Sequence, residues 1–115
     1  MITVEEESDC VRATVFGELT VDDYRELEQA IGRELTSAAR LKMFIDLTRM
    51  SGFTLDVAWE ELRFTRKHAH DFRRVAVVTD NQWTSWLSWV TAAFTDAEVQ
   101  IFEEVTSAEA WLSEA

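Results

Sequence analysis

Apolar and polar residues alternate along five short stretches of the chain, and a period of two is typical of strands with one buried face. This alternation predicts strands at residues 2–7, 11–16, 41–47, 74–79 and 98–102. The stretch 41–47 is the clearest, because apolar side chains recur at every second position: Leu41, Met43, Ile45 and Leu47. Since a turn at residues 8–9 joins the first two strands, we expect an antiparallel hairpin there.

Apolar residues at helical spacing occupy the segments that follow the hairpin. They predict helices over 21–37, 55–68 and 82–94, and a short closing helix that starts at 106–109 and runs through 112. Each helix has a candidate N-cap: Thr20 with Asp23 three residues on, Thr54, Asp80 or Asn81, and Thr106. The order of elements predicts an α/β fold with a single five-stranded, mostly parallel sheet that begins with an antiparallel hairpin.

The two faces of the predicted sheet differ in polarity. One face collects only apolar residues: Val11, Ala13, Val15, Leu41, Met43, Ile45, Leu47, Val75, Val77, Val99 and Ile101. The other is polar, with Arg12, Thr14, Lys42, Arg74 and Gln100, diluted by Phe16, Phe44, Val78 and Phe102. Because strands covered on both faces are usually apolar throughout, we expect the four helices to lie mainly on one face.

Composition bounds the class of protein. The chain has 115 residues, which fits one domain over 1–115, and its net charge of −11 argues against nucleic-acid binding. No apolar run is long enough for a membrane span, and no basic-then-apolar leader opens the sequence. The single cysteine, Cys10, excludes an internal disulfide. These features predict a cytoplasmic protein.

A set of short motifs resembles the SpoIIAA-like branch of the STAS superfamily. The set comprises Gly17-Glu18-Leu19-Thr20-x-x-Asp23-Tyr24, Phe44-Ile45-Asp46-Leu47, Gly52-Phe53-Thr54, Trp59-Glu60-Glu61-Leu62, Ala76-Val77-Val78-x-Asp80-x-x-Trp83, Phe94-x-x-Ala97-Glu98-Val99-x-x-Phe102 and Ala110-Trp111-Leu112. The resemblance covers nearly the whole chain. It implies a bacterial protein with a fold related to anti-sigma-factor antagonists and CRAL-TRIO lipid-transfer proteins, and it implies no enzymatic activity.

The sequence departs from the antagonists at their switch. Those proteins carry a phosphorylatable serine in an Asp-Ser-Ser-Gly type turn before the second helix. The corresponding stretch here is Gly52-Phe53-Thr54-Leu55-Asp56, in which Thr54 has the only hydroxyl. We therefore expect Thr54 to cap a helix and not to serve as a kinase target.

Residues for catalysis or metal binding are few. The chain has no glycine-rich nucleotide loop, no CxxC and no HExxH. His68 and His70 would point ~200° apart on a helix, so we expect no metal site, and no cofactor is implied. Asp46 and Asp80 are predicted at the carboxyl ends of parallel strands, where they could act as an acid/base pair. The simpler explanation is that Asp80 caps a helix and Asp46 binds loop amides, so we predict no catalytic residue.

Two clusters are candidate binding sites. Five of the eleven basic residues fall within 63–74 and could hold an anionic head group, a phosphate or an acidic partner surface: Arg63, Arg66, Lys67, Arg73 and Arg74. The alternative is that they interact with a helix C-terminus and with Glu60 or Glu61. A second group lies off the stripes that should face the sheet and predicts a self-association surface: Val57, Phe64, Trp89 and Ala93. Packing of Trp89 on a neighbouring helix, an apolar ligand groove, and association through the other sheet face remain alternatives.

Together these features predict a non-enzymatic STAS-like regulatory or protein-interaction module that forms a homodimer. The alternative function is a small carrier or sensor of an apolar anionic ligand such as a fatty acid. In that alternative the tryptophan-rich segment 82–94 forms the groove, and the basic cluster binds the head group.

Overall fold

The computed structural model describes residues 1–7, 9–36, 40–54, 56, 63, 67, 70–80 and 97–114. Five strands form one sheet in the order β1-β2-β3-β4-β5. Their bounds are β1 Ile2–Glu7, β2 Cys10–Leu19, β3 Leu41–Phe53, β4 Phe72–Val78 and β5 Glu98–Phe102. The pair β1–β2 is antiparallel and the other neighbours are parallel, which confirms the predicted sheet.

Two helices are seen in the described part of the chain, α1 (Val21–Leu35) and α4 (Val105–Ser113). The helices expected over 55–68 and 82–94 lie almost wholly outside the described residues. No helix within the described ranges is both long enough and apolar enough to cross a membrane.

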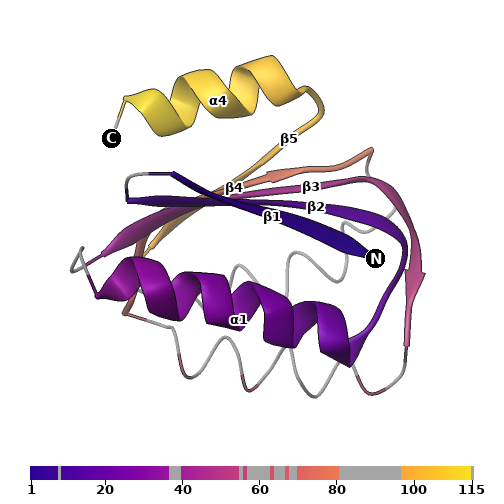
Figure 1. Cartoon of the computed structure of the whole chain (residues 1–115). Coiled ribbons are helices and arrows are strands. Elements are labelled where there is room, and N and C mark those ends of the chain that lie inside the picture. The colour runs from indigo at the N-terminus through magenta and orange to yellow at the C-terminus, as the bar shows by residue number, and fades with distance from the viewer. Residues whose placement is uncertain are drawn as a thin grey trace.

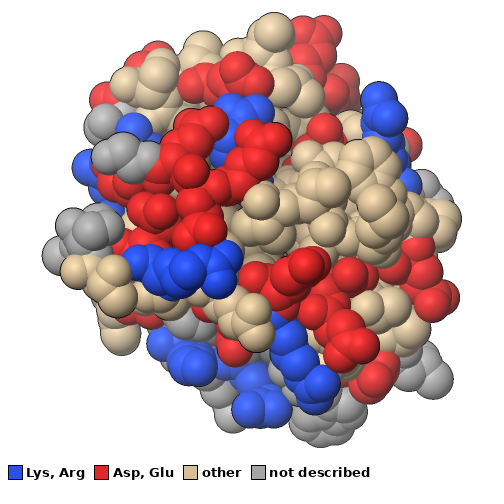
Figure 2. Space-filling model, viewed as in Figure 1, with Lys and Arg blue, Asp and Glu red and all other residues tan. Residues whose placement is uncertain are grey.

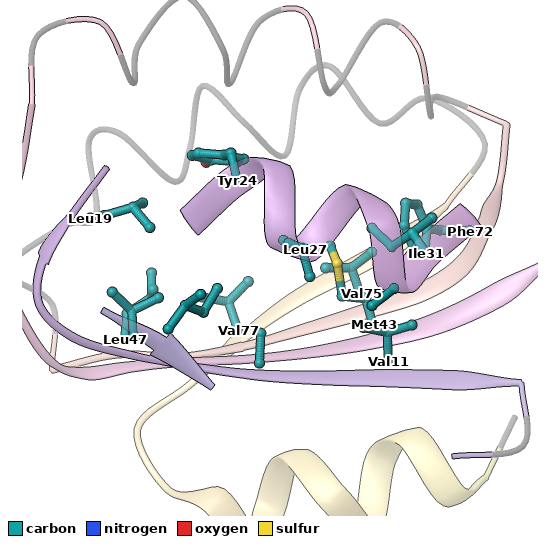
Figure 3. Packing of buried hydrophobic residues seen from close by; sticks show 14 of the residues in the cluster. Val11, Leu19, Tyr24, Leu27, Ile31, Met43, Leu47, Phe72, Val75 and Val77 are labelled. Carbon is teal, nitrogen blue, oxygen red and sulfur yellow. The ribbon is translucent and has the colours of Figure 1, made fainter. Parts of the chain in front are cut away.

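Helix α1 begins where the sequence predicts. Thr20 Oγ1 accepts a hydrogen bond from the Asp23 amide, and the Asp23 carboxylate accepts one from the Thr20 amide, which completes a capping box. The buried stripe of α1 then packs on the sheet, where Leu27 and Ile31 lie near strand residues such as Val11, Met43 and Val75, and Tyr24 belongs to the same buried cluster (Figure 3). Full burial of one such aliphatic side chain stabilises the fold by about 1.5–3 kcal/mol.

Helix α4 lies on the opposite face of the sheet from α1 (Figure 1). Ala108 and Leu112 of this helix pack on Phe44, Ala76 and Val78. The prediction that the helices lie mainly on one face is therefore wrong for α4. Helix α4 packs there because the apolar residues that interrupt the polar face lie together on β3, β4 and β5. Together they form an apolar area large enough for one short helix.

Strands β2 and β3 run further than their alternation suggests. Gly17, expected to end β2, has a φ of 65° and lies beside a register shift, after which pairing resumes to Leu19 and Phe53. Because such irregularities add an unpaired residue, they break the period of two without ending the strand. Asp46 is consequently inside β3 and not at its end.

Candidate functional site

A polar cleft opens where β2 and β3 end and α1 begins. Leu19 and Phe53 are register partners at the ends of the two strands, and the Thr54 amide donates to the Leu19 carbonyl over 3.1 Å. The cleft has a volume of about 290 Å³ and is lined by Thr20, Val21, Asp22, Arg25, Thr54 and Asp56. The carboxyl ends of parallel strands are the common position for binding sites in open α/β sheets.

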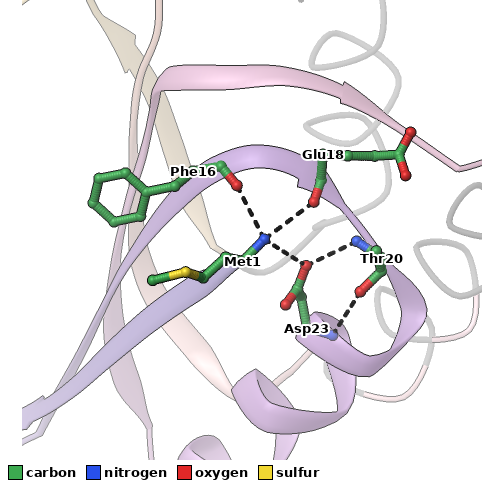
Figure 4. A network of polar contacts seen from close by, with 5 residues as sticks. All are labelled: Met1, Phe16, Glu18, Thr20 and Asp23. Atoms are coloured by element: carbon green, nitrogen blue, oxygen red, sulfur yellow. Dashed lines mark hydrogen bonds and ion pairs between the residues drawn. The ribbon is translucent and has the colours of Figure 1, made fainter.

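One wall of the cleft is fixed by a polar network around Asp23 (Figure 4). The Asp23 carboxylate accepts from the Thr20 amide at 2.9 Å and from the Met1 amino group at 3.4 Å. The same amino group donates to the carbonyls of Phe16 at 3.0 Å and Glu18 at 3.2 Å. The start of α1 is thereby tied to both β1 and β2.

The charges in the cleft are exposed. Arg25 pairs with Asp22 at 3.2 Å, and the side chains are 67% and 89% exposed, so water screens this pair and it adds little stability. Asp56 is exposed as well. Two carboxylates and one guanidinium therefore face solvent on a fixed frame, which suits recognition of a polar surface.

Thr54 differs from its neighbours in the cleft. Its Oγ1 is buried and forms no hydrogen bond within the described structure, so the expected helix-capping role of this hydroxyl is not supported. The expectation that Thr54 is not a phosphorylation target stays a prediction.

The two candidate acid/base residues differ in position, because Asp46 lies inside β3, in register with Val78, whereas Asp80 follows β4. Asp46 Oδ1 accepts from the Thr48 amide at 2.9 Å and from its hydroxyl at 2.7 Å, which is the local amide binding offered as the simpler explanation. Asp80 is exposed just after β4. No group of three or more potential metal ligands occurs in the described ranges.

Cys10 has little nucleophilic character. Burial, with a smaller contribution from Glu7, raises the pKa of its thiol to about 11. The thiol therefore stays protonated near neutral pH, and the reactive thiolate is scarce.

The basic cluster is divided among several partners. Arg73 forms an ion pair with Asp9 in the turn between β1 and β2, and Lys67 lies 3.8 Å from Glu28 of α1. Arg74 donates to the Trp111 carbonyl at 2.6 Å and lies 4.6 Å from the centre of that indole ring. Arg63 is exposed, whereas Arg66 lies outside the described residues. Anion binding by this cluster stays a prediction.

The predicted self-association residues cannot be placed. Val57, Phe64, Trp89 and Ala93 all lie outside the described residues. Conversely, sequence reasoning missed the lining residues Asp22, Arg25 and Asp56. Topology could have pointed to them, because binding sites in open α/β sheets commonly lie at the carboxyl ends of parallel strands. The cleft is at the carboxyl ends of β2 and β3 as the structure shows them.

Comparison with known proteins identifies the family and the fold. A family model described as SpoIIAA-like matches residues 10–113. The chain belongs to the SpoIIAA-like family. A search of curated proteins finds no match.

Solved structures of SpoIIAA-like fold are similar over almost their full length. An uncharacterized DUF3478-family protein from Shewanella loihica is 28% identical, with a TM-score of 0.76 and 97% and 92% of the two chains covered. The unphosphorylated anti-sigma factor antagonist SpoIIAA is 11% identical, with a TM-score of 0.63 over 100% and 99%. An anti-sigma factor antagonist from Mycobacterium paratuberculosis is 20% identical, with a TM-score of 0.58 over 98% and 95%. At these identities the two antagonists show a shared fold.

Proposed function

We propose that this SpoIIAA-like chain is a non-enzymatic regulatory module that acts by binding another protein, with the cleft at the start of α1 in the contact surface. One observation carries the proposal: Asp22, Arg25 and Asp56 present exposed charges on a frame held by the capping box and the β2–β3 ends. Exposed charges that are held in place favour reversible, specific binding of a partner more than catalysis. Two structural relatives are named as anti-sigma factor antagonists, which supports a regulatory role for the fold.

The alternative function, a carrier of an apolar anionic ligand, has weaker support. The polar cleft does not suit an acyl chain, because ligand pockets of that kind are mostly apolar. In the basic cluster, Arg73 and Arg74 already interact with groups of this chain. The groove invoked for the ligand involves residues 82–94, which lie outside the described residues.

The test is affinity purification of the tagged protein from its source cells, with quantification of each co-purifying protein. We expect Asp56→Arg to deplete a specific partner at least ~tenfold, because reversing a charge in the contact surface disfavours docking. The matched control is Glu114→Arg, an exposed charge at the end of α4. Equal recovery with wild type and Asp56→Arg would contradict the cleft as the contact surface. A lipid mass that co-purifies in native mass spectrometry would favour the carrier instead.

We also propose that the chain self-associates as a homodimer through Val57, Phe64, Trp89 and Ala93. Burial of a tryptophan at the centre of an interface can be worth at least ~2 kcal/mol, more than tenfold in dissociation constant. Trp89→Glu should therefore shift a dimer to monomer without unfolding the domain. Sedimentation would contradict this if the wild type is a monomer at high micromolar concentration, or if the variant stays dimeric.

A further inference from the structure

Part of the sheet face that carries α4 is left uncovered. The helix packs on β3, β4 and β5, so the outward side chains of β1 and β2 lie beside it and not beneath it. We call this area the open face, and it comprises Thr3, Glu5, Glu7, Thr14 and Phe16. The three β1 residues are exposed and the two β2 residues are half-buried. Cys10 and Arg12, the register partners of Glu7 and Glu5, lie on the same side of the sheet, and the Arg12 side chain reaches toward α4, where it pairs with Glu109.

Two carboxylates lie on the open face. Glu6, which points to the other side of β1, is paired with Arg33 at 2.9 Å, and Arg12 is paired with Glu109 at 3.1 Å. Neither Glu5 nor Glu7 has such a partner among the described residues. Figure 2 shows a dense acidic group beside an uncharged area on the side of the molecule that carries β1.

The dimensions of the open face match one α-helix. Two strands span about 10 Å, which is the diameter of a helix with its side chains. Alternate residues on a strand lie about 6.8 Å apart, and helix positions i and i+4 rise by about 6 Å. Basic residues at i and i+4 could therefore reach Glu5 and Glu7, and the next turn would lie over Thr3, Thr14 and Phe16.

The two ends of the open face carry different kinds of side chain. Glu7 pairs in register with Cys10 and Glu5 with Arg12, whereas Thr3 pairs with Thr14. The acidic end of the open face is therefore next to the turn, and Phe16, with Arg49 lying 5.8 Å from the centre of its ring, is at the other end. A matching helix carries its basic residues at one end and an apolar residue at the other.

We propose that the open face binds a basic amphipathic helix of a partner protein, which lies alongside α4. A second copy that offers its own open face is a poor occupant, because two faces with the same unpaired carboxylates repel each other. Anionic lipids and nucleic acids are disfavoured by the same repulsion. The proposal rests on the proposed function in that both treat the chain as a protein-binding module, but the two surfaces are different.

The test is fluorescence anisotropy with a labelled, designed helical peptide that has lysines at i and i+4 and leucine one turn on. We expect saturable one-to-one binding that Glu5→Lys weakens by about tenfold. A peptide with glutamates in place of the lysines should bind Glu5→Lys better than it binds wild type. The matched control is Glu26→Lys, an exposed residue of α1 on the other side of the sheet with the same change in charge.

Equal weakening by Glu5→Lys and Glu26→Lys would overturn the proposal, because it would show attraction to net charge alone. Absence of binding to the wild type would overturn it as well. Amide shifts of labelled protein provide a second readout, with the largest changes expected at Thr3, Thr14 and Phe16. Changes confined to Asp22, Arg25 and Asp56 would instead place the peptide in the cleft, which rejects the open face and leaves the proposed function intact.

Discussion

Single residues at the start of α1 do several tasks at once. Asp23 is almost fully buried, yet its carboxylate binds the Thr20 amide and the Met1 amino group while its own amide is bound by Thr20 Oγ1. A capping residue could be predicted from Thr20 and Asp23 by their spacing. The approach of β1 could not, because nothing local in the sequence brings residue 1 beside residue 23.

Asp23→Ala should lower the free energy of unfolding by about 1–2 kcal/mol, since it leaves the Thr20 amide without its partner. Urea denaturation followed by circular dichroism measures this. Asp22→Ala is the control, because that carboxylate is 89% exposed and its pair with Arg25 is screened. A larger loss for Asp22→Ala than for Asp23→Ala would show that the network adds no stability.

Thr54→Val separates the two roles considered for Thr54. If its buried hydroxyl is unbonded, valine fills the same space without an unsatisfied polar group, and stability should stay equal or rise by up to about 1 kcal/mol. Loss of an N-cap would instead cost about 1 kcal/mol. Thermal melts of both proteins decide between these outcomes, and phosphorylated Thr54 in protein from its source cells would contradict the inaccessible hydroxyl.

Individual elements were predictable to different degrees. The strands were found because the alternation of apolar and polar residues is a local signal. Helix α1 was found because its N-cap at Thr20 and its stripe of apolar residues predict the same helix. The end of β3 was missed because a register shift near Thr14 and Phe16 hides the period. The side chosen by α4 was missed because Phe44 and Val78 looked like exceptions on a polar face, and only the sheet order shows that they are neighbours. Arg73 and Arg74 are neighbours in the sequence, and that position alone did not reveal that Arg73 binds Asp9 whereas Arg74 binds the Trp111 carbonyl.

Arg74 holds the last turn of α4, so its replacement should loosen that helix. It donates to the Trp111 carbonyl, lies over the indole ring and is 3.4 Å from Glu98. Arg74→Met should cost about 1–3 kcal/mol and speed amide exchange in α4 more than in α1. Hydrogen exchange measures both helices in one sample. Arg25→Met is the control, and unchanged exchange in α4 would show that apolar packing alone holds it.

The whole molecule is a sheet with a separate core on each side and a large negative charge. Among the described residues, sixteen buried side chains form the core with α1, and a smaller group forms the core with α4. The charge of −11 is spread over a domain with a radius of gyration of 12.8 Å, so most charges lie close enough to repel at low salt. The fold class followed from sequence, but the second core and the cleft depend on contacts between distant segments.

Stability should therefore increase with salt. Raising sodium chloride from low to physiological concentration shortens the Debye length from about 30 Å to about 8 Å, which screens the repulsion among the carboxylates more than the short ion pairs. We expect the melting temperature to rise by a few degrees, and to rise less in a Glu5→Gln, Glu7→Gln double variant. A fall in melting temperature with salt would show that ion pairs such as Arg33–Glu6 dominate instead.

Consecutive residues of β3 serve opposite sides of the molecule, and this limits how the gene can change. Met43 belongs to the core with α1 and Phe44 to the core with α4. Inserting one codon here would exchange the two sets of side chains, turning Lys42 or Asp46 toward an apolar layer on one side while removing Phe44 from the other. Length variation should therefore be purged from the middle of β3 by selection, yet be tolerated in the turn that precedes Cys10, where no core depends on the phase of the strand.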